Sequence, residues 1–382
     1  MKKRPMPYWV SVIIIFILVV LLNALACIRV FCDFYADKVY GGISDFIGKT
    51  MDIFPFAVGE IIMSFYSIFV ILSVVLAFML LFFRKKEKYK IFVIKYLKSM
   101  LLVFLCTLLI YTLNWIIPYK SSILGDKKLG RDSYVRAYSI EELQTLRNYI
   151  VEMLNQTSYE VERDNEGHLI YRDYKTVNTE LETSMKELSN KYTRLNGYYP
   201  KLKAAMCSSA LEWMNIGGYT YPYTMEATYN SYVTKLYYPS LYAHEISHHH
   251  GYYRENEANF LSYLGCINSE DAFVRYSGYI DAFYYVDDAY FEALSKAFDD
   301  KKAWEIYKKQ PKLSERVYTD EVEASREASE RYEEDSHPME KLDNTAKKAA
   351  EKGWNIQEEV TEGNYYDDVV GLMLYYYAGT LY

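Results

Sequence analysis

The sequence of 382 residues is short of positive charge, of cysteine and of histidine. It has 43 lysine and arginine residues against 50 aspartate and glutamate residues, a formal net charge of −7. Binding to nucleic acid needs a basic face for the phosphate backbone, so this balance argues against nucleic acid as a partner. Five cysteines, three of them in or beside apolar segments, do not make a disulfide framework. Cys207 and Cys266 could pair only in an oxidising compartment, and we interpret them as unpaired, small apolar residues.

Long apolar runs are missing from residues 118–382 until the last few positions, whereas residues 1–117 contain three. These runs cover about 8–28, 56–83 and 99–117, and each is about as long as, or longer than, the roughly 20 apolar residues that cross a bilayer. The first part carries 13 basic and 6 acidic residues and the second carries 30 and 44, so a region of +7 is joined to a region of −14. The sequence therefore predicts an α-helical membrane anchor of three spans, followed by one soluble domain with a sizeable core.

The orientation in the membrane is predicted from the positions of the basic residues. Residues 2–4 are all basic and precede the first span, and five more basic residues lie at 84–90, between the second and third spans. The connection at 31–55 has two lysines against four aspartates. We therefore predict a multi-pass cell-membrane protein with a cytoplasmic N-terminus and an extracytoplasmic domain at 118–382. If the first run were instead a signal peptide cleaved near 24–26, the two remaining spans would still leave that domain outside.

Most of the soluble domain has helical periodicity. Ser139 and Glu142 match a capping box that would open its first helix, because the hydroxyl and the carboxylate each satisfy a free backbone amide. Residues 156–177 are polar and irregular and are predicted to form a loop or a short hairpin. Helices are predicted near 139–155, 178–195, 200–214, 240–250, 254–266, 270–299, 312–335 and 338–352.

One segment, residues 219–230, departs from the helical pattern. Its odd positions are mostly tyrosine and its even positions are mostly polar, and this period of two predicts a half-buried strand. Pro222 cannot donate a ladder hydrogen bond, so the strand is expected at a sheet edge or with a break at that position. An edge strand beside an active site can bind an extended peptide by strand addition, and an ordinary structural strand explains the pattern equally well.

Four of the six histidines lie close together, around the pattern His244-Glu245-Ile246-Ser247-His248. His244 and His248 are four residues apart, so on a helix they share one face and can reach one metal ion. Neutral imidazole suits Zn²⁺, and Glu245 can reach a metal-bound water without binding the ion. The other histidines are given no metal-binding role: His168, His249, His250 and His337.

A third protein ligand is expected from the next helix, because a catalytic zinc site has three protein ligands and a water. Gly251 lies where a left-handed residue would end the first helix, and the second helix begins near Arg254. Glu255 shares a helix face with small and polar residues that permit close approach, whereas Glu257 lines up with the apolar face. We therefore favour Glu255 and keep Glu257 as the alternative ligand. Asn259, one turn further on, could hydrogen-bond the far nitrogen of a ligating histidine and fix its tautomer.

The stretch His244–Gly265 resembles gluzincin metallopeptidases, whose third ligand is a glutamate from a following helix. In the membrane CAAX-processing proteases and bacterial heat-shock membrane proteases this glutamate opens an E-x-x-A-D pattern, which Glu255–Asn259 matches with Asn in place of Asp. The chain also resembles a bacterial family of uncharacterised membrane proteins with HExxH-x6-E, in particular at Gly217–Asn230 and at Tyr365-Tyr366-Asp367. The resemblance implies a zincin-like, mainly α, α+β metallopeptidase domain with a small sheet, and it makes Tyr365 or Tyr366 a candidate donor to the oxyanion.

These features predict a membrane-anchored zinc metallopeptidase that hydrolyses a peptide or protein substrate. Two neutral histidines and one carboxylate leave a zinc site with net charge +1, which lowers the pKa of its bound water towards about 7. Glu245 would take the proton of this water as it attacks the peptide carbonyl, and would deliver it to the leaving amine. The alternative is a non-catalytic, zinc-stabilised sensor or binding domain at the cell surface, which would use the same ligands without needing Glu245.

Overall fold

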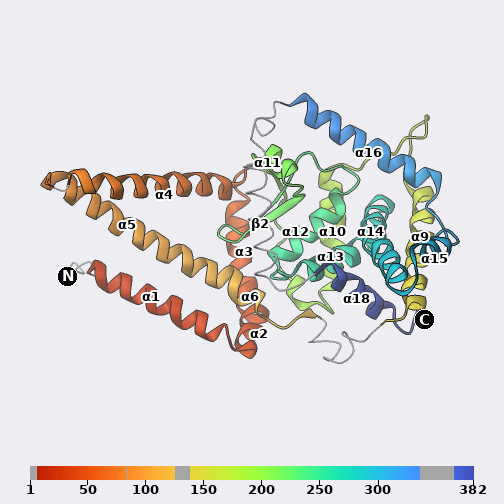
Figure 1. Ribbon diagram of the computed structural model, residues 1–382, viewed down its shortest axis with the longest axis horizontal. Coiled ribbons are helices and arrows are strands. Elements are labelled where there is room, and N and C mark those ends of the chain that lie inside the picture. The colour runs from red at the N-terminus through yellow and green to blue at the C-terminus, as the bar shows by residue number, and fades with distance from the viewer. Residues whose placement is uncertain (1–6, 84, 125–137, 336–364) are drawn as a thin grey trace.

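Three long helices extend from one side of a mainly helical body that contains a small sheet (Figure 1). The computed structural model describes residues 7–83, 85–124, 138–335 and 365–382. The long helices are α1 (Tyr8–Leu25), α4 (Val58–Phe83) and α5 (Glu87–Tyr111). Each is long and apolar enough to cross a bilayer, α5 together with the short helix that follows it, and this confirms the three predicted apolar helices.

The third of these helices is longer than the apolar run that predicted it. It begins at Glu87, because the helix continues through the basic residues that precede the run. A π-helical turn, η1 (Thr112–Ile116), and α6 (Ile117–Tyr119) extend it at the other end. Pro118 has no N–H to donate to the carbonyl of Asn114, and this missing bond explains the local change of helix type.

The connection between the first and second long helices is itself helical. It forms α2 (Arg29–Lys38) and α3 (Tyr40–Met51), which lie between the long helices and the globular body (Figure 1). Tyr40 is completely buried and belongs to an apolar cluster that also contains Ile117 and Tyr253. The membrane part and the globular part therefore share a packed core.

The helices of the globular body are α9 (Ile140–Glu160), α10 (Tyr174–Leu188), α11 (Ser208–Trp213), α12 (Tyr238–His249), α13 (Glu255–Ile267), α14 (Ala272–Ala297), α15 (Asp300–Tyr307), α16 (Glu315–Glu334) and α18 (Tyr365–Tyr377). The predicted capping box at Ser139 and Glu142 is present at the start of α9. Every residue from Asn256 to Cys266 in α13 is buried, because α10, α12, α14 and α18 pack around this helix. The helix that carries Glu255 is therefore the most enclosed element of the body.

The prediction of one helix at 200–214 is wrong. Strand β1 (Lys203–Ala204) takes its first part, and only α11 is helical. Lys203 forms a buried ion pair with Glu226, 2.6 Å from nitrogen to oxygen, and this pair aligns the segment with the neighbouring strand. A partner that is remote in the sequence thus overrides the local helical pattern.

The region predicted as a loop or hairpin at 156–177 is shorter than expected. Its first residues complete α9, its last residues begin α10, and an isolated bridge joins Arg163 to Leu169 between them. Asp173 caps the N-terminus of α10 through a bond from the N–H of Thr176. The helix predicted at 338–352 lies outside the described residues.

The sheet has three short strands in the order β1-β3-β2. β3 (Glu226–Tyr229) runs parallel to β1 and antiparallel to β2 (Gly218–Tyr221). The single strand predicted at 219–230 is therefore a hairpin, and the predicted break lies at Pro222. β2 lies at an edge of this sheet, as expected.

Both faces of the hairpin are covered, so it is more deeply buried than the half-buried strand that was predicted. Thr220 and Ala227 are cross-strand partners on the face that contacts α12. Tyr221 and Glu226 are partners on the other face, which contacts the first turn of α4. The approach is so close that a Cβ at Gly59 of α4 would lie 2.4 Å from the Tyr221 ring.

Candidate metal centre

The turn between α12 and α13 brings the predicted ligands together. Gly251 has φ 84°, its N–H donates to the carbonyl of His248 at 2.9 Å, and the N–H of Tyr252 donates to the carbonyl of Ser247 at 3.1 Å. This pair of bonds is the Schellman arrangement, which stops α12 where the sequence predicted. The chain then reverses, and α13 begins at Glu255 and packs against α12.

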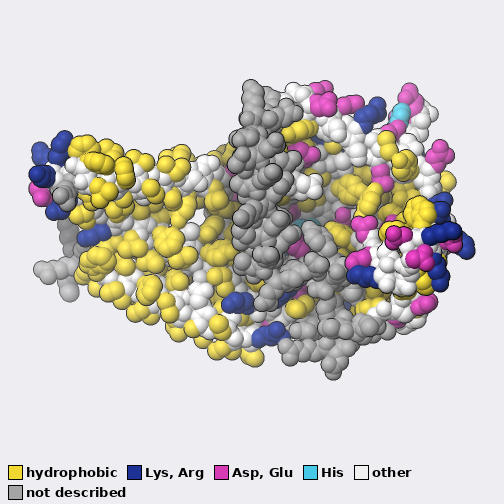
Figure 2. All heavy atoms as spheres, viewed as in Figure 1, with side chains coloured by type: hydrophobic (Ala, Val, Ile, Leu, Met, Phe, Trp, Pro, Cys, Tyr) yellow, Lys and Arg dark blue, Asp and Glu magenta, His cyan; other side chains and the backbone are white. Residues whose placement is uncertain are grey.

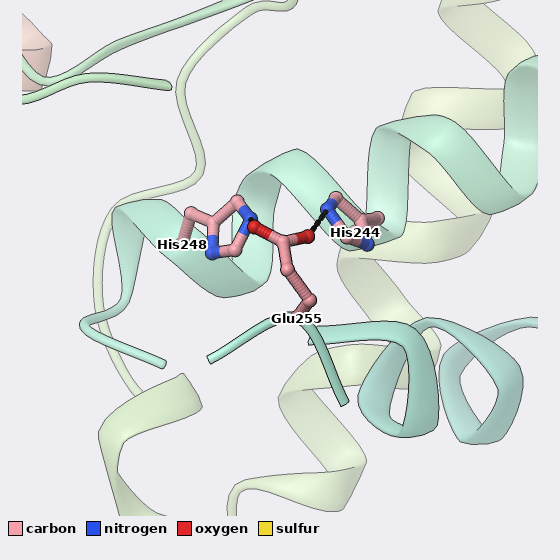
Figure 3. Close-up of side chains that lie close together, drawn as sticks. All are labelled: His244, His248 and Glu255. Carbon is pink, nitrogen blue, oxygen red and sulfur yellow. Dashed lines mark ion pairs between the residues drawn. The ribbon is translucent and has the colours of Figure 1, made fainter. Parts of the chain in front are cut away.

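His244, His248 and Glu255 form one compact group (Figure 3). Glu255 lies between the two imidazole rings, with Oε2 3.2 Å from His244 Nε2 and Oε1 3.6 Å from His248 Nε2. One ligand atom from each residue lies within 4.8 Å of the others. Tetrahedral zinc, with bonds of about 2.0–2.2 Å, requires ligand atoms about 3.3–3.5 Å apart. The two distances to Glu255, 3.2 and 3.6 Å, are close to this spacing, so the group could hold one metal ion.

The far nitrogens of both histidines face hydrogen-bond acceptors. His244 Nδ1 lies 2.7 Å from Asn259 Oδ1, and His248 Nδ1 lies 2.8 Å from the carbonyl oxygen of Tyr252. Each acceptor favours a proton on Nδ1, so Nε2, which faces Glu255, is the ring nitrogen available to a metal ion. Asn259 has the contact that the sequence predicted, whereas the carbonyl of Tyr252 was missed because its position depends on the turn geometry.

Glu245 is buried, with 2% of its surface exposed, on the side of α12 that faces the hairpin. The hydroxyl of Thr220 lies 2.9 Å from its Oε2 and 3.0 Å from its carbonyl oxygen, so this hydroxyl can donate to either. A Cβ at Gly218 would lie 2.8 Å from Glu245 Oε1 and 2.6 Å from the carbonyl of Thr228, so only glycine fits there. Sequence reasoning missed both residues, although the Gly217-Gly218 pair before the strand was a signal of close approach.

The charges of the group are strongly coupled. Burial lowers the pKa of His244, but its contacts with Glu255 outweigh burial and raise that pKa to about 9. Burial would raise the pKa of Glu255, but His248 and His244 hold it well below its usual value. Burial raises the pKa of Glu245, against the opposing effect of the two histidines. Because the pKa of His244 is raised, a cation that binds here must displace the proton of this residue, so its affinity depends on pH.

The remaining candidates lie away from this group. Glu257 is buried, and its Oε1 accepts the N–H of Leu124 instead of approaching the histidines. His249 and His250, at the C-terminal end of α12, are buried. His249 Nδ1 lies 2.9 Å from the carbonyl of Met225, and the His250 ring packs on Tyr199.

The remaining residues named in the sequence analysis are two histidines, the two cysteines and the two candidate tyrosines. His168 is exposed, with Nδ1 3.3 Å from Asp164. Cys207 and Cys266 are both free, one exposed and the other buried. His337 lies outside the described residues, and so do the side chains of Tyr365 and Tyr366, on which the predicted oxyanion donor depends.

One family model matches most of the chain. The model of a family described as "Protein of unknown function (DUF3810)" matches residues 35–373. The chain belongs to this family. The matched region contains the second and third membrane helices, the sheet and the His244–His248–Glu255 group, so the family unit includes both parts of the molecule. No curated protein and no solved structure gives a significant match.

Proposed function

We propose that this member of the DUF3810 family is a membrane-anchored zinc metallopeptidase. The observation that carries the proposal is the convergence of His244, His248 and Glu255 at zinc-binding distances, with Glu245 buried one residue along from the first histidine. The resemblance of His244–Gly265 to gluzincin metallopeptidases agrees with this donor set. Zinc on these three ligands would leave one position for water and would lower the pKa of that water.

The residues around His244, His248 and Glu255, which we call the trio, have separate tasks in this proposal. Asn259 and the Tyr252 carbonyl hold the imidazole rings with Nε2 towards the ion. Glu245 accepts a proton from the attacking water and delivers it to the leaving amine, a role that suits a carboxylate whose pKa is raised by burial. Thr220 holds that carboxylate in place.

The edge strand β2 supplies a site for the substrate backbone. It contacts α12 directly, and Gly218 and Thr220 of β2 both face the Glu245 carboxylate. A peptide added in extended conformation along such an edge gains main-chain hydrogen bonds that do not depend on its sequence. The peptide would then pass beside the general base.

The zinc-stabilised sensor is the competing function, and the burial of Glu245 supports the peptidase over it. A purely structural zinc site does not require a buried carboxylate beside it. Here Gly218 leaves room for the Glu245 carboxylate, and the hydroxyl of Thr220 donates a hydrogen bond to it. The test uses the full-length protein in vesicles and a pooled peptide library, with wild type compared with Glu245→Gln. We expect zinc content to be equal in both, and turnover in the variant to be lower by about 10²-fold or more, the usual contribution of a positioned base. Zinc binding by both proteins with no cleavage by either would favour the sensor.

The proposed orientation places the globular body outside the cell. Figure 2 shows lysine and arginine side chains gathered at the end of the long helices that is farthest from the globular body, with apolar side chains between. The positive-inside rule puts that end in the cytoplasm. In a variant from which the five native cysteines have been removed, a single cysteine introduced at Lys86 should resist an impermeant thiol reagent in intact cells, whereas one at Ser122 should react. The reverse labelling pattern would place the body in the cytoplasm.

A further inference from the structure

The end of the metal-binding helix is held by the membrane part of the chain. The hydroxyl of Tyr40, in α3, lies 3.2 Å from the carbonyl of His249 and 2.8 Å from the hydroxyl of Tyr253. Gly48 of α3 faces the His249 ring so closely that a Cβ there would lie 2.9 Å from it. These contacts fix α12 directly against the helical connection between the first two spans.

One aromatic ring separates the third span from a metal ligand. The Trp115 and Tyr253 ring centroids are 4.4 Å apart, and Tyr253 stacks on the His248 ring at 6.1 Å with an interplanar angle of 14°. Trp115 also stacks between Tyr111 and Tyr119, so the end of this span is lined with aromatic side chains. Tyr and Trp concentrate where a membrane helix meets the interface with water, and the trio therefore lies beside that interface.

The peptide-binding edge proposed above is fixed to the spans in the same way. Asn114 donates from Nδ2 to the carbonyl of Pro222, in the turn after β2, at 2.8 Å. On the adjacent strand, Glu226 accepts the N–H groups of Val58 and Gly59, the first residues of α4, at 3.0 and 2.7 Å. The ends of two spans thus hold both strands of the hairpin.

Exposed apolar side chains mark the plane of the membrane surface. Val30 and Phe34 lie four residues apart on α2 and are 77% and 60% exposed, Phe46 on α3 is 73% exposed, and Ile53 after it is 76% exposed. Short helices with such apolar faces, connected to membrane spans, lie in the headgroup layer. Because α3 contacts His249 directly, the trio lies roughly one helix diameter, about 10 Å, above that layer.

We propose that the substrate is a polypeptide anchored in the same membrane, cleaved in the segment next to its own span or lipid anchor. The inference rests on the proposed peptidase function and adds to it the place where the substrate is presented. The spans and α3 lie on the membrane side of the site, so a chain that emerges from the bilayer beside them reaches it without crossing bulk water. Such a tethered chain also has a high effective concentration, in the millimolar range for a short flexible connection.

The first test measures where the site lies, and it needs no activity. The full-length protein is placed in phosphatidylcholine vesicles that contain a headgroup-labelled fluorescent lipid, and Co²⁺ is added in place of zinc. Co²⁺ bound by the trio should quench the headgroup fluorophore, because the two lie within about 10 Å to a few tens of ångströms of each other. The His244→Ala/His248→Ala double variant is the control and should show no quenching. Stoichiometric Co²⁺ binding without quenching would overturn the inference, whereas absence of Co²⁺ binding would overturn the metal site itself.

The second test measures which substrates are cleaved. One pooled set of peptide segments is presented in three forms: free in solution, joined to a membrane helix by a short linker, and joined by a long Gly/Ser linker. At equal bulk concentration we expect the short-linker form to be cleaved about tenfold faster or more than the free form, with the long linker between them. Equal rates for free and tethered segments would overturn the membrane-bound substrate while leaving the peptidase function intact. No cleavage of any form would overturn both.

Discussion

Two buried carboxylates lie on opposite sides of the β2–β3 hairpin, and their surroundings differ sharply. Glu226, on the side of the membrane helices, accepts Lys203 Nζ at 2.6 Å and the first two N–H groups of α4. Glu245, on the side of the trio, is equally buried, and in the described part of the chain Thr220 is its one side-chain donor. A buried carboxylate whose acceptor sites are filled by charged and backbone donors stabilises a fold, whereas one with unused acceptor capacity can take a proton.

The same contrast separates the two glutamates at the start of α13. Glu257 is enclosed and accepts the N–H of Leu124, whereas the side chain of Glu255 is 51% exposed and has both oxygens near imidazole nitrogens. The two residues are two positions apart, so the helix turns their side chains in different directions. Glu257 belongs to the packing of the body, and Glu255 belongs to the group with His244 and His248.

The largest effect should come from Glu255→Gln. This change keeps the size of the side chain but removes a charged ligand. We therefore expect zinc affinity to fall by more than about 100-fold, which exceeds the loss expected when a residue that only hydrogen-bonds a ligand is removed. Glu257→Gln is the matched control and should keep zinc while lowering the free energy of unfolding. Zinc content measured on both purified variants checks the prediction, and the reverse outcome would make Glu257 the ligand.

An intermediate effect is expected on the other side of the hairpin. Glu226→Gln leaves the buried Lys203 ammonium without its counter-charge, so the free energy of unfolding should fall by about 3–5 kcal/mol. Zinc stoichiometry of the folded protein should not change. Glu182→Gln breaks the exposed pair with Lys186 and should cost less than about 1 kcal/mol. Denaturant unfolding of both variants in the same detergent measures the two losses of unfolding free energy. Equal losses would show that the buried ion pair of Glu226 contributes no more to stability than the exposed pair of Glu182.

The smallest effect should come from Thr220→Val, which removes the donor to Glu245 and keeps the shape of the side chain. A neutral hydrogen bond contributes about 1 kcal/mol, so turnover should fall by about fivefold, with KM and zinc content unchanged. Thr179→Val, at an exposed threonine that bonds within its own helix, is the control. An unchanged rate would show that Thr220 does not position the base.

Local features were the ones that could be predicted from the sequence. The apolar runs predicted three long helices, Ser139 and Glu142 predicted a capping box, and Gly251 predicted the end of α12. The spacing of His244 and His248 placed both on one helix face. Each of these features depends on residues within a few turns of one another, whose relation follows from helix geometry alone.

Only the tertiary structure decided the features that join distant parts of the chain. Residues 203–204, at the start of the segment predicted to be helical, form a strand, where Lys203 pairs with Glu226, 23 residues away. Glu226 in turn binds the start of α4, 168 residues away. Thr220 reaches Glu245 across 25 residues, and Tyr40 reaches His249 across 209. A periodic pattern predicts which face of an element is apolar, but it carries no information about which remote element covers that face. The sequence by itself therefore determined the long helices and the spacing of His244 and His248. Three-dimensional packing decided the strands, the surroundings of Glu245 and the contacts that join the His244–His248–Glu255 group to the long apolar helices.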